Sequence, residues 1–223
     1  ASDFGGKTES DFIRCELVNS VGVLKSCQLA TQVKAKHFIF LSSLFASYNF
    51  QNSSYGIYGL SKRHAEEVAQ LFCHEFDLFL TILRPPQLYD EASKLRKHQA
   101  MFFYIIDQAE KGQDIFIYGS HDPRRNFLHV FDLAEICARV LKNRHHGLFL
   151  CPHPETVTLG QVATIAFSIF GRGGSVKFQK EKPDLKDLPQ VSDFELYKKI
   201  DFYPQITLSH GIKKIKFFRE ALG

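Results

Sequence analysis

Short apolar runs that alternate with segments of helical length constrain the fold most strongly. Residues 37–41 form a continuous apolar run, as expected for a strand that is buried on both faces of a sheet. Residues 58–76 fit a helix, and residues 79–83 fit a second buried strand, which the following pair of prolines ends. Strands and helices that alternate in this way predict an α/β fold with a parallel sheet.

The rest of the chain continues the alternation with shorter strands and longer loops. Helices are predicted over residues 20–33, 97–111, 159–170 and 209–222, and another should begin at an Asp132 N-cap. Short strands are predicted over residues 114–118 and 148–150, and residues 127–130 lead into the helix that begins at Asp132. Loops or turns are expected over residues 44–57, 171–174 and 181–190, and residues 1–18 have no assigned structure.

Composition excludes several classes of function. The chain has 223 residues and a net charge of +4, and its basic residues are dispersed rather than clustered as in nucleic-acid-binding proteins. No apolar run approaches the roughly 18 residues of a membrane span, and no secretory signal opens the sequence. The five cysteines show neither a CxxC motif nor zinc-ligand spacing. We therefore expect free thiols, no metal site and a reducing, cytoplasmic location.

The segment Tyr58-Gly-Leu-Ser-Lys62 carries the main chemical signal. Four-residue spacing places Tyr58 and Lys62 on one face of a helix, one turn apart. A lysine ammonium near a tyrosine stabilises the phenolate and lowers the tyrosine pKa from its usual value of about 10. Such a tyrosine could exchange a proton with a substrate hydroxyl or carbonyl while a hydride moves to or from a cofactor.

Two hydroxyls add to this signal, because Ser42 and Ser43 directly follow the first apolar run. Open α/β sheets bind ligands at the carboxyl ends of their strands, so a serine there can donate to the oxygen that Tyr58 serves. A tyrosine and a lysine at this spacing also occur on ordinary surface helices. A strand, two serines, a loop and then this helix are a more specific combination.

In these segments the sequence resembles the extended short-chain dehydrogenase/reductases, the NAD-dependent epimerase/dehydratase family, of the nucleotide-sugar type. The resemblance runs through most of the chain and covers five segments: Asn19-Ser-Val-Gly22, Phe38-Ile-Phe-Leu-Ser-Ser43, Tyr58-Gly-Leu-Ser-Lys62, Leu83-Arg-Pro85, and Arg125-Asn-Phe-Leu-His-Val130 with Asp132-Leu-Ala134. It implies a partial Rossmann-like parallel sheet with catalytic residues over residues 1–90. Residues 91–223 would mainly form a smaller C-terminal α/β substrate lobe, with some segments returning to the core.

The resemblance also implies roles for individual residues. The catalytic set would be Ser43, Tyr58 and Lys62. The NAD or NADP site would comprise Asn19, Ser42, Tyr58, Lys62 and Pro85. A nucleotide sugar would be bound by Ser43, Gln87 and Arg125, with Arg125 facing its phosphates.

The sequence departs from the family pattern in three places. Gln87 replaces a substrate-binding asparagine, and Leu44-Phe45 replace the Asp-Glu pair of the 4,6-dehydratases, so elimination of water is not expected. No Gly-x-x-Gly-x-x-Gly motif is found, and Ala1 aligns just after the family's fourth strand. We therefore expect residues 1–223 alone to bind NAD(P) weakly or not at all and to be poorly stable. Residues 38–41 should have an unpaired edge or an uncovered face.

These observations predict an NAD(P)-dependent oxidoreductase or isomerase that epimerises a nucleotide sugar or reduces a keto-sugar. Both reactions need the same serine, tyrosine and lysine, and the sequence does not separate them. The alternative is a non-catalytic, truncated or degenerate relative that binds or interacts without turnover. The missing glycine-rich motif favours this alternative and the intact catalytic set opposes it. Formation of a homodimer is left open.

Overall fold

The computed structural model describes residues 2–52 and 54–221, which divide into two compact units. Unit 1 comprises residues up to 85 together with residues 135–151 and 193–202. Unit 2 comprises residues 86–134 and 152–192 and the chain from residue 203 onward. Each unit is therefore assembled from three separate segments of the sequence. Ala1 and the predicted helix end at Leu222 lie outside the described residues.

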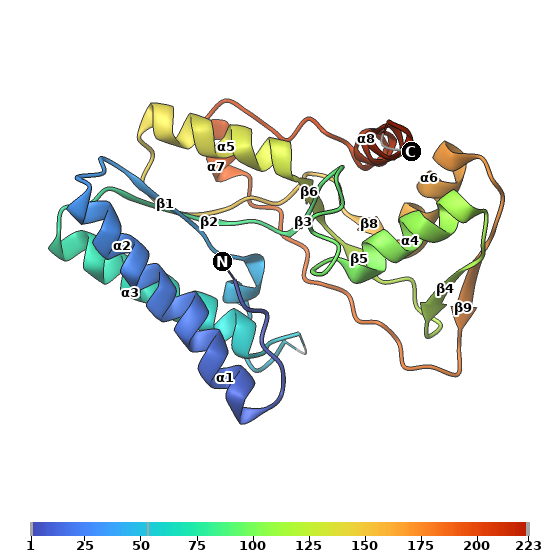
Figure 1. Ribbon diagram of the computed structural model, residues 1–223, viewed down its shortest axis with the longest axis horizontal. Coiled ribbons are helices and arrows are strands. Elements are labelled where there is room, and N and C mark those ends of the chain that lie inside the picture. Colours follow the sequence, from blue (N-terminus) through green and yellow to red (C-terminus); the bar gives the residue numbers. More distant parts are fainter. Residues whose placement is uncertain (1, 53, 222–223) are drawn as a thin grey trace. The chain divides into compact units, whose positions relative to one another are not determined.

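Unit 1 contains a three-stranded parallel sheet in the order β1-β2-β7. Its elements are α1 (Glu9–Glu16), η1 (Leu17–Val21), α2 (Gly22–Gln32), β1 (Phe38–Leu41), η2 (Leu44–Ser47), α3 (Ile57–Glu75), β2 (Leu80–Arg84), β7 (Gly147–Leu150), α7 (Glu195–Lys199) and most of α5 (Val130–Asn143). Figure 1 shows α2 and α3 side by side on one face of β1 and β2, with α7 and the unit-1 part of α5 on the other. The α/β prediction with a parallel sheet is confirmed.

Packing between the helices and the sheet explains this arrangement. Ala65 of α3 packs with Phe40 of β1 and Ile82 of β2, and all three are buried. The small alanine lets the helix backbone come close to the sheet, where the larger side chains fill the space. The parallel strands β1 and β2 are joined through α3, the usual crossover for a parallel pair.

The burial predicted for the first strand is wrong. Phe40 is buried, but Phe38 and Ile39 are only partly buried and Leu41 is 42% exposed. Within the described residues β1 pairs only with β2, so it is an edge strand of this sheet. The expected unpaired edge is present, and the position at the edge explains why the apolar run is not buried on both faces.

The first helix begins much earlier than predicted. A capping box at Thr8 and Asp11 starts α1, and the helix continues through the π-helical segment η1 into α2. Asn19 therefore lies inside a long helix and not at its start. A π-helical segment inserts an extra residue into the helix and turns the following side chains to a different face.

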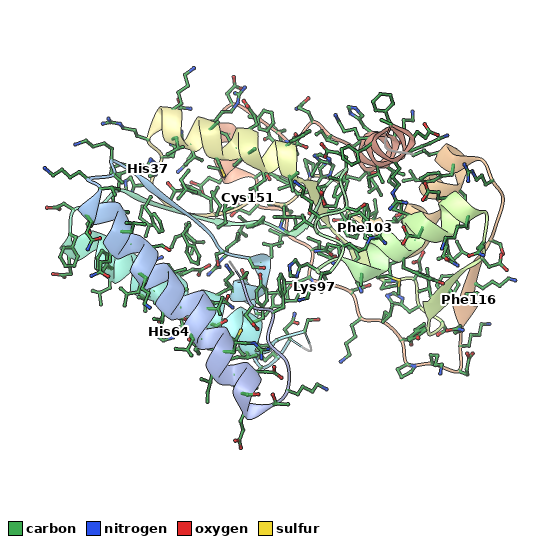
Figure 2. The ribbon with its side chains drawn as sticks, viewed as in Figure 1. His37, His64, Lys97, Phe103, Phe116 and Cys151 are labelled. Carbon is green, nitrogen blue, oxygen red and sulfur yellow. The ribbon has the colours of Figure 1, made fainter. Side chains whose placement is uncertain are left out.

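Unit 2 is built on a separate apolar core. Its elements are β3 (Gln87–Tyr89), α4 (Ala100–Lys111), β4 (Ile115–Tyr118), β5 (Arg124–Arg125), β6 (Phe127–His129), β8 (Val157–Thr158), α6 (Leu159–Phe170), β9 (Val176–Gln179) and α8 (Leu208–Glu220). The strands pair as β3-β6, β4-β9 and β5-β8. Helices α4, α6 and α8 contribute to the core, in which Phe103 of α4 is fully buried (Figure 2).

Helix ends in unit 2 follow the sequence signals in two cases and contradict them in one. Thr158 caps α6, and Gly112 adopts the left-handed conformation after α4, as the sequence predicts. Gly171, in the predicted turn over residues 171–174, adopts the same conformation after α6. Asp132 is not an N-cap, because α5 begins at Val130. Its carboxylate accepts hydrogen bonds from the backbone N–H groups of Gln205 and Ile206.

Several predicted segments contain structure that the sequence patterns did not indicate. The predicted loop over residues 44–57 contains η2 at its start, and strands β3, β5, β6, β8 and β9 and helix α7 were not expected. None of the helices in the described part of the chain is long and apolar enough to cross a membrane.

Candidate active site

Ser42 and Ser43 lie where β1 ends. The backbone N–H of Ser42 donates to the carbonyl oxygen of Leu83, so the pairing with β2 continues past the last residue of β1. Ser43 then starts η2, and its Oγ accepts a hydrogen bond from the N–H of Phe45 at 3.3 Å. The N–H of Leu44 donates to the carbonyl oxygen of Pro85, which fixes this proline beside the turn. Both serines are buried.

The Ser42 hydroxyl is buried and has no hydrogen-bond partner among the described residues. A buried hydroxyl without a partner costs free energy, on the order of 1–3 kcal/mol. Such a group at the carboxyl end of a parallel strand is suited to a polar ligand group.

Tyr58 is in the first turn of α3, and its side chain lies beside the serine turn that follows β1. The Ser43 hydroxyl and the hydroxyl of Ser2, in the N-terminal segment, are near enough to the Tyr58 hydroxyl to act on its pKa, which both lower by hydrogen bonding. Burial raises the pKa of Tyr58, and the two hydrogen bonds only partly offset that effect. The lysine-lowered tyrosine pKa expected from the sequence is therefore wrong for this structure, because loss of hydration dominates.

Lys62 lies one helical turn after Tyr58 and is buried beside β1. Its Nζ donates to the carbonyl oxygen of Leu41 at 3.0 Å and lies 5.0 Å from the centroid of the Phe40 ring. Burial lowers the pKa of Lys62 to about 8, although Glu66 acts in the opposite direction. At pH 7 the site therefore holds a neutral Tyr58 phenol and a mostly protonated Lys62, which loses its proton as the pH rises through about 8.

Glycine at position 59 is what allows α3 to lie this close to the serine turn. A Cβ at this position would be 2.5 Å from the carbonyl oxygen of Phe45, a distance that real Cβ atoms essentially never show. Arg63, one turn further along α3, donates to the carbonyl oxygens of Ala46 and Tyr48. The close approach and these hydrogen bonds together hold Tyr58 against Ser43.

Asn19 uses both ends of its side-chain amide within the protein. Its Oδ1 accepts from the N–H of Asp3 at 2.9 Å, and its Nδ2 donates to the carbonyl oxygen of Asp3 at 2.8 Å. Nδ2 also lies 2.9 Å from Ser61 Oγ and 3.2 Å from Cys15 Sγ. Asn19 therefore ties the N-terminal segment to the helix that carries Tyr58 and Lys62.

Two aromatic rings flank Tyr58 and were not predicted. Phe4 stacks on the Tyr58 ring with centroids 4.6 Å apart, and Phe45 contacts it edge-on at 5.8 Å. Nothing in the local sequence around Phe4 indicates this contact, because it depends on how the N-terminal segment folds back over α3. Cys15 and Ser61 were also missed, although both are spaced one helical turn from residues that were identified.

The two predicted substrate residues outside unit 1 both lie in unit 2. Gln87 begins β3, and its Nε2 donates to Gln99 Oε1 at 2.7 Å while its Oε1 is buried without a hydrogen-bond partner among the described residues. Arg125 is in β5 and its Nη1 donates to the carbonyl oxygens of Arg124 and Lys186, both at 2.8 Å. These residues are positioned by a different core from the one that holds Tyr58.

Comparison with known proteins agrees with this geometry. The family model described as the NAD dependent epimerase/dehydratase family matches residues 5–151. The chain belongs to this family. The resemblance inferred from the five motif segments is thereby confirmed, and the match contains Ser42, Ser43, Tyr58 and Lys62.

Individual members of the family that resemble the chain act on nucleotide sugars. The chain is 25% identical over 169 residues to a dTDP-4-dehydro-6-deoxy-D-allose reductase of Streptomyces bikiniensis, covering 73% of this chain and 50% of the reductase. It thus spans about half the length of this curated relative.

Solved structures of the family share the fold. The UDP-glucose 4-epimerase of Thermotoga maritima, solved with UDP-glucose, has a TM-score of 0.79 at 19% identity, covering 100% of this chain and 76% of that chain. The UDP-glucose 4-epimerase of Thermus thermophilus, solved with NAD, has a TM-score of 0.78 at 17% identity, covering 99% of this chain and 76% of that chain. Both are Rossmann-fold epimerases, so the predicted fold class is confirmed.

The close contact at Gly59 predicts a specific loss of stability. Gly59→Ala should lower the free energy of unfolding by about 1–3 kcal/mol, because the new methyl group collides with the Phe45 carbonyl oxygen. Gly56→Ala is the matched control, since a Cβ there meets no atom within 4 Å, and it should change the free energy by less than about 1 kcal/mol. Urea denaturation measures both, and equal effects of the two substitutions would contradict the packing argument.

Proposed function

We propose that the protein is an NAD(P)-dependent enzyme that acts on a nucleotide-linked sugar, by 4-epimerisation or by reduction of a keto-sugar. The observation that carries the proposal is that the Ser43 and Tyr58 hydroxyls interact at the carboxyl end of β1, with the Lys62 ammonium one helical turn away. Membership of the family and the reductase and epimerase relatives support it.

The residues present fit a nicotinamide cofactor. Ser42 offers a buried hydroxyl without a partner among the described residues, and the Lys62 ammonium, which donates to Leu41, can donate two further hydrogen bonds to ribose hydroxyls. The carbonyl oxygen of Pro85 accepts a hydrogen bond from the N–H of Leu44, which places Pro85 beside the serine turn. When bound, NAD or NADP would supply or accept the hydride. The Asn19 amide is already hydrogen-bonded to Asp3 and Ser61. Asn19 would therefore support the cofactor site by holding these two residues in position.

Tyr58 and Ser43 would handle the proton. In reduction, the neutral Tyr58 phenol donates its proton to the substrate carbonyl oxygen as the oxygen becomes an alcohol. Ser43 donates a hydrogen bond to the same oxygen, which stabilises the negative charge that develops there. The protonated Lys62 favours the phenolate that remains on Tyr58. In the oxidative direction the same groups act in reverse, so one set serves both candidate reactions.

The substrate's nucleotide portion would be bound by unit 2. The Arg125 guanidinium can bind a diphosphate through charged hydrogen bonds. The buried Gln87 Oε1 is an acceptor suited to a substrate hydroxyl or N–H group.

Identification of the product distinguishes the two reactions. The protein is incubated with UDP-linked and dTDP-linked sugars and with the corresponding 4-keto sugars, with and without NADH or NADPH. An epimerase converts a nucleotide sugar without net consumption of reduced cofactor, because the hydride returns to the same substrate. A reductase consumes one reduced cofactor for each keto-sugar. Because residues 1–223 alone are expected to bind NAD(P) weakly, the cofactor is added at concentrations that saturate a weak site, and no conversion of any of these substrates under those conditions would contradict the proposal.

Removing the Tyr58 hydroxyl should abolish most turnover but spare binding. Tyr58→Phe is expected to lower kcat by about 10²–10⁴-fold, because it removes the proton carrier and leaves the ring that Phe4 contacts. The affinity for the nucleotide sugar should change little. Tyr55→Phe is the control, since it removes a hydroxyl but keeps the ring that packs against Arg63. Wild-type kcat in Tyr58→Phe would show that another group transfers the proton.

Arg125→Ala should weaken nucleotide-sugar binding instead. A charged hydrogen bond contributes roughly 1.5–3 kcal/mol, so we expect a loss of that size in calorimetric titrations with UDP-glucose. Arg124→Ala removes the neighbouring positive charge and serves as the control for a general electrostatic effect. Equal losses in the two variants would show that Arg125 makes no specific contact with the diphosphate.

A further inference from the structure

Two cysteines lie together between α2 and α3, away from the serine turn. Cys27 of α2 and Cys73 of α3 belong to one small apolar cluster with Ala30, Ala69 and Leu78. They are 0% and 3% exposed. The small alanine side chains of this cluster, one on each helix, allow α2 and α3 to come close at the level of the two thiols.

The two thiols are not equivalent. Interaction between the two side chains raises the pKa of Cys27 and lowers the pKa of Cys73. Burial acts against the thiolate at both positions. The thiol with the lowered pKa more readily becomes the thiolate, which is the nucleophilic form of cysteine.

A surface pocket reaches Cys73 and not the other thiols. The pocket has a volume of about 280 Å³, and its lining includes Cys73, His74, Phe79, Ile82 and His146, all of unit 1. Cys15, Cys27, Cys137 and Cys151 are absent from this lining. A small solute can therefore approach Cys73 from the pocket while Cys27 remains behind it in the cluster.

We propose that Cys27 and Cys73 form a reactive dithiol, in which hydrogen peroxide oxidises Cys73 and Cys27 then closes a disulfide between α2 and α3. In the first step the Cys73 thiolate attacks one oxygen of the peroxide, forming a sulfenic acid and releasing hydroxide. In the second, the Cys27 sulfur attacks the Cys73 sulfur, and the sulfenic oxygen leaves as water with the Cys27 proton. The two cysteines lose two electrons in total, and the peroxide gains them.

The disulfide would act on the helix that carries the candidate catalytic residues. Cys73 is near the carboxyl end of α3, and Tyr58 and Lys62 are near its start. A covalent link to α2 restricts separation of the two helices and lowers the entropy of the unfolded chain. The oxidised protein should therefore melt at a higher temperature than the reduced protein, and a thiol reductant should reverse the shift.

The test is a map of all five cysteines after oxidation. The reduced protein is treated with hydrogen peroxide, denatured, alkylated with N-ethylmaleimide, digested and analysed by mass spectrometry. We expect one intramolecular link, Cys27–Cys73, with loss of two hydrogen atoms from the intact mass. Cys15 and Cys151 should stay reduced during oxidation and should therefore be found alkylated. Cys137 is only partly buried, so it is the thiol that exposure alone would favour.

Three variants fix the order of the steps. In Cys27→Ser the Cys73 sulfenic acid should persist and be trapped by dimedone, whereas in Cys73→Ser the thiol of Cys27 should stay reduced. Cys137→Ser should still form the link. The proposal is overturned if wild-type protein shows Cys27 and Cys73 both alkylated after Cys137 has been oxidised, if Cys73 is oxidised without forming the link, or if the link joins two molecules. Because the wild-type map alone decides these outcomes, the test does not depend on the folding of any variant.

Discussion

The candidate site depends on how closely α3 approaches the turn that follows β1. Tyr58 and Lys62 are carried by the helix, and Ser42 and Ser43 by the strand end, so the site exists only if these two parts of the backbone meet. Gly59 makes the approach possible, because a Cβ there would be 2.5 Å from the Phe45 carbonyl oxygen. The glycine of the Tyr-Gly-x-Ser-Lys segment is thus a packing residue whose role is to place a phenol beside a serine.

Burial sets the electrostatics of the site once the contact is made. Lys62 is held by a single backbone carbonyl, with its charge near the Phe40 ring, and its pKa falls to about 8. Tyr58 is shifted in the opposite direction for the same physical reason, since burial disfavours the charged form of either group. The neutral phenol and the ammonium therefore coexist at pH 7, which is the arrangement that protonation of a carbonyl oxygen requires. Above about pH 8 the ammonium is lost.

Local sequence patterns predicted the elements that local forces determine. The apolar run of β1, the helix with Tyr58 and Lys62 on one face, and the glycine stop after α4 were all placed within a few residues. The catalytic candidates followed from the same patterns, because strand-end and helical spacing bring Ser43 and Tyr58 to one place.

Features that depend on tertiary contacts could not be predicted in this way. Phe4 stacks on Tyr58 beside the point where the Asn19 amide binds the backbone of Asp3, and no spacing rule connects residues so far apart. Asp132 has the residue type of an N-cap, but two distant backbone N–H groups engage its carboxylate instead. The tyrosine pKa was predicted from its lysine neighbour, whereas the cost of burial is larger and depends on the whole fold.

The central claim is that Ser43 and Tyr58 act as one unit on one substrate oxygen. A double-mutant cycle on kcat tests this most directly, with Ser43→Ala, Tyr58→Phe and the double variant compared with wild type. If both hydroxyls serve the same oxygen, the double variant should be about as slow as the slower single variant, because residues that act together lose their effect together. If the two losses in kcat multiply instead, the hydroxyls act independently and the account of the site is wrong.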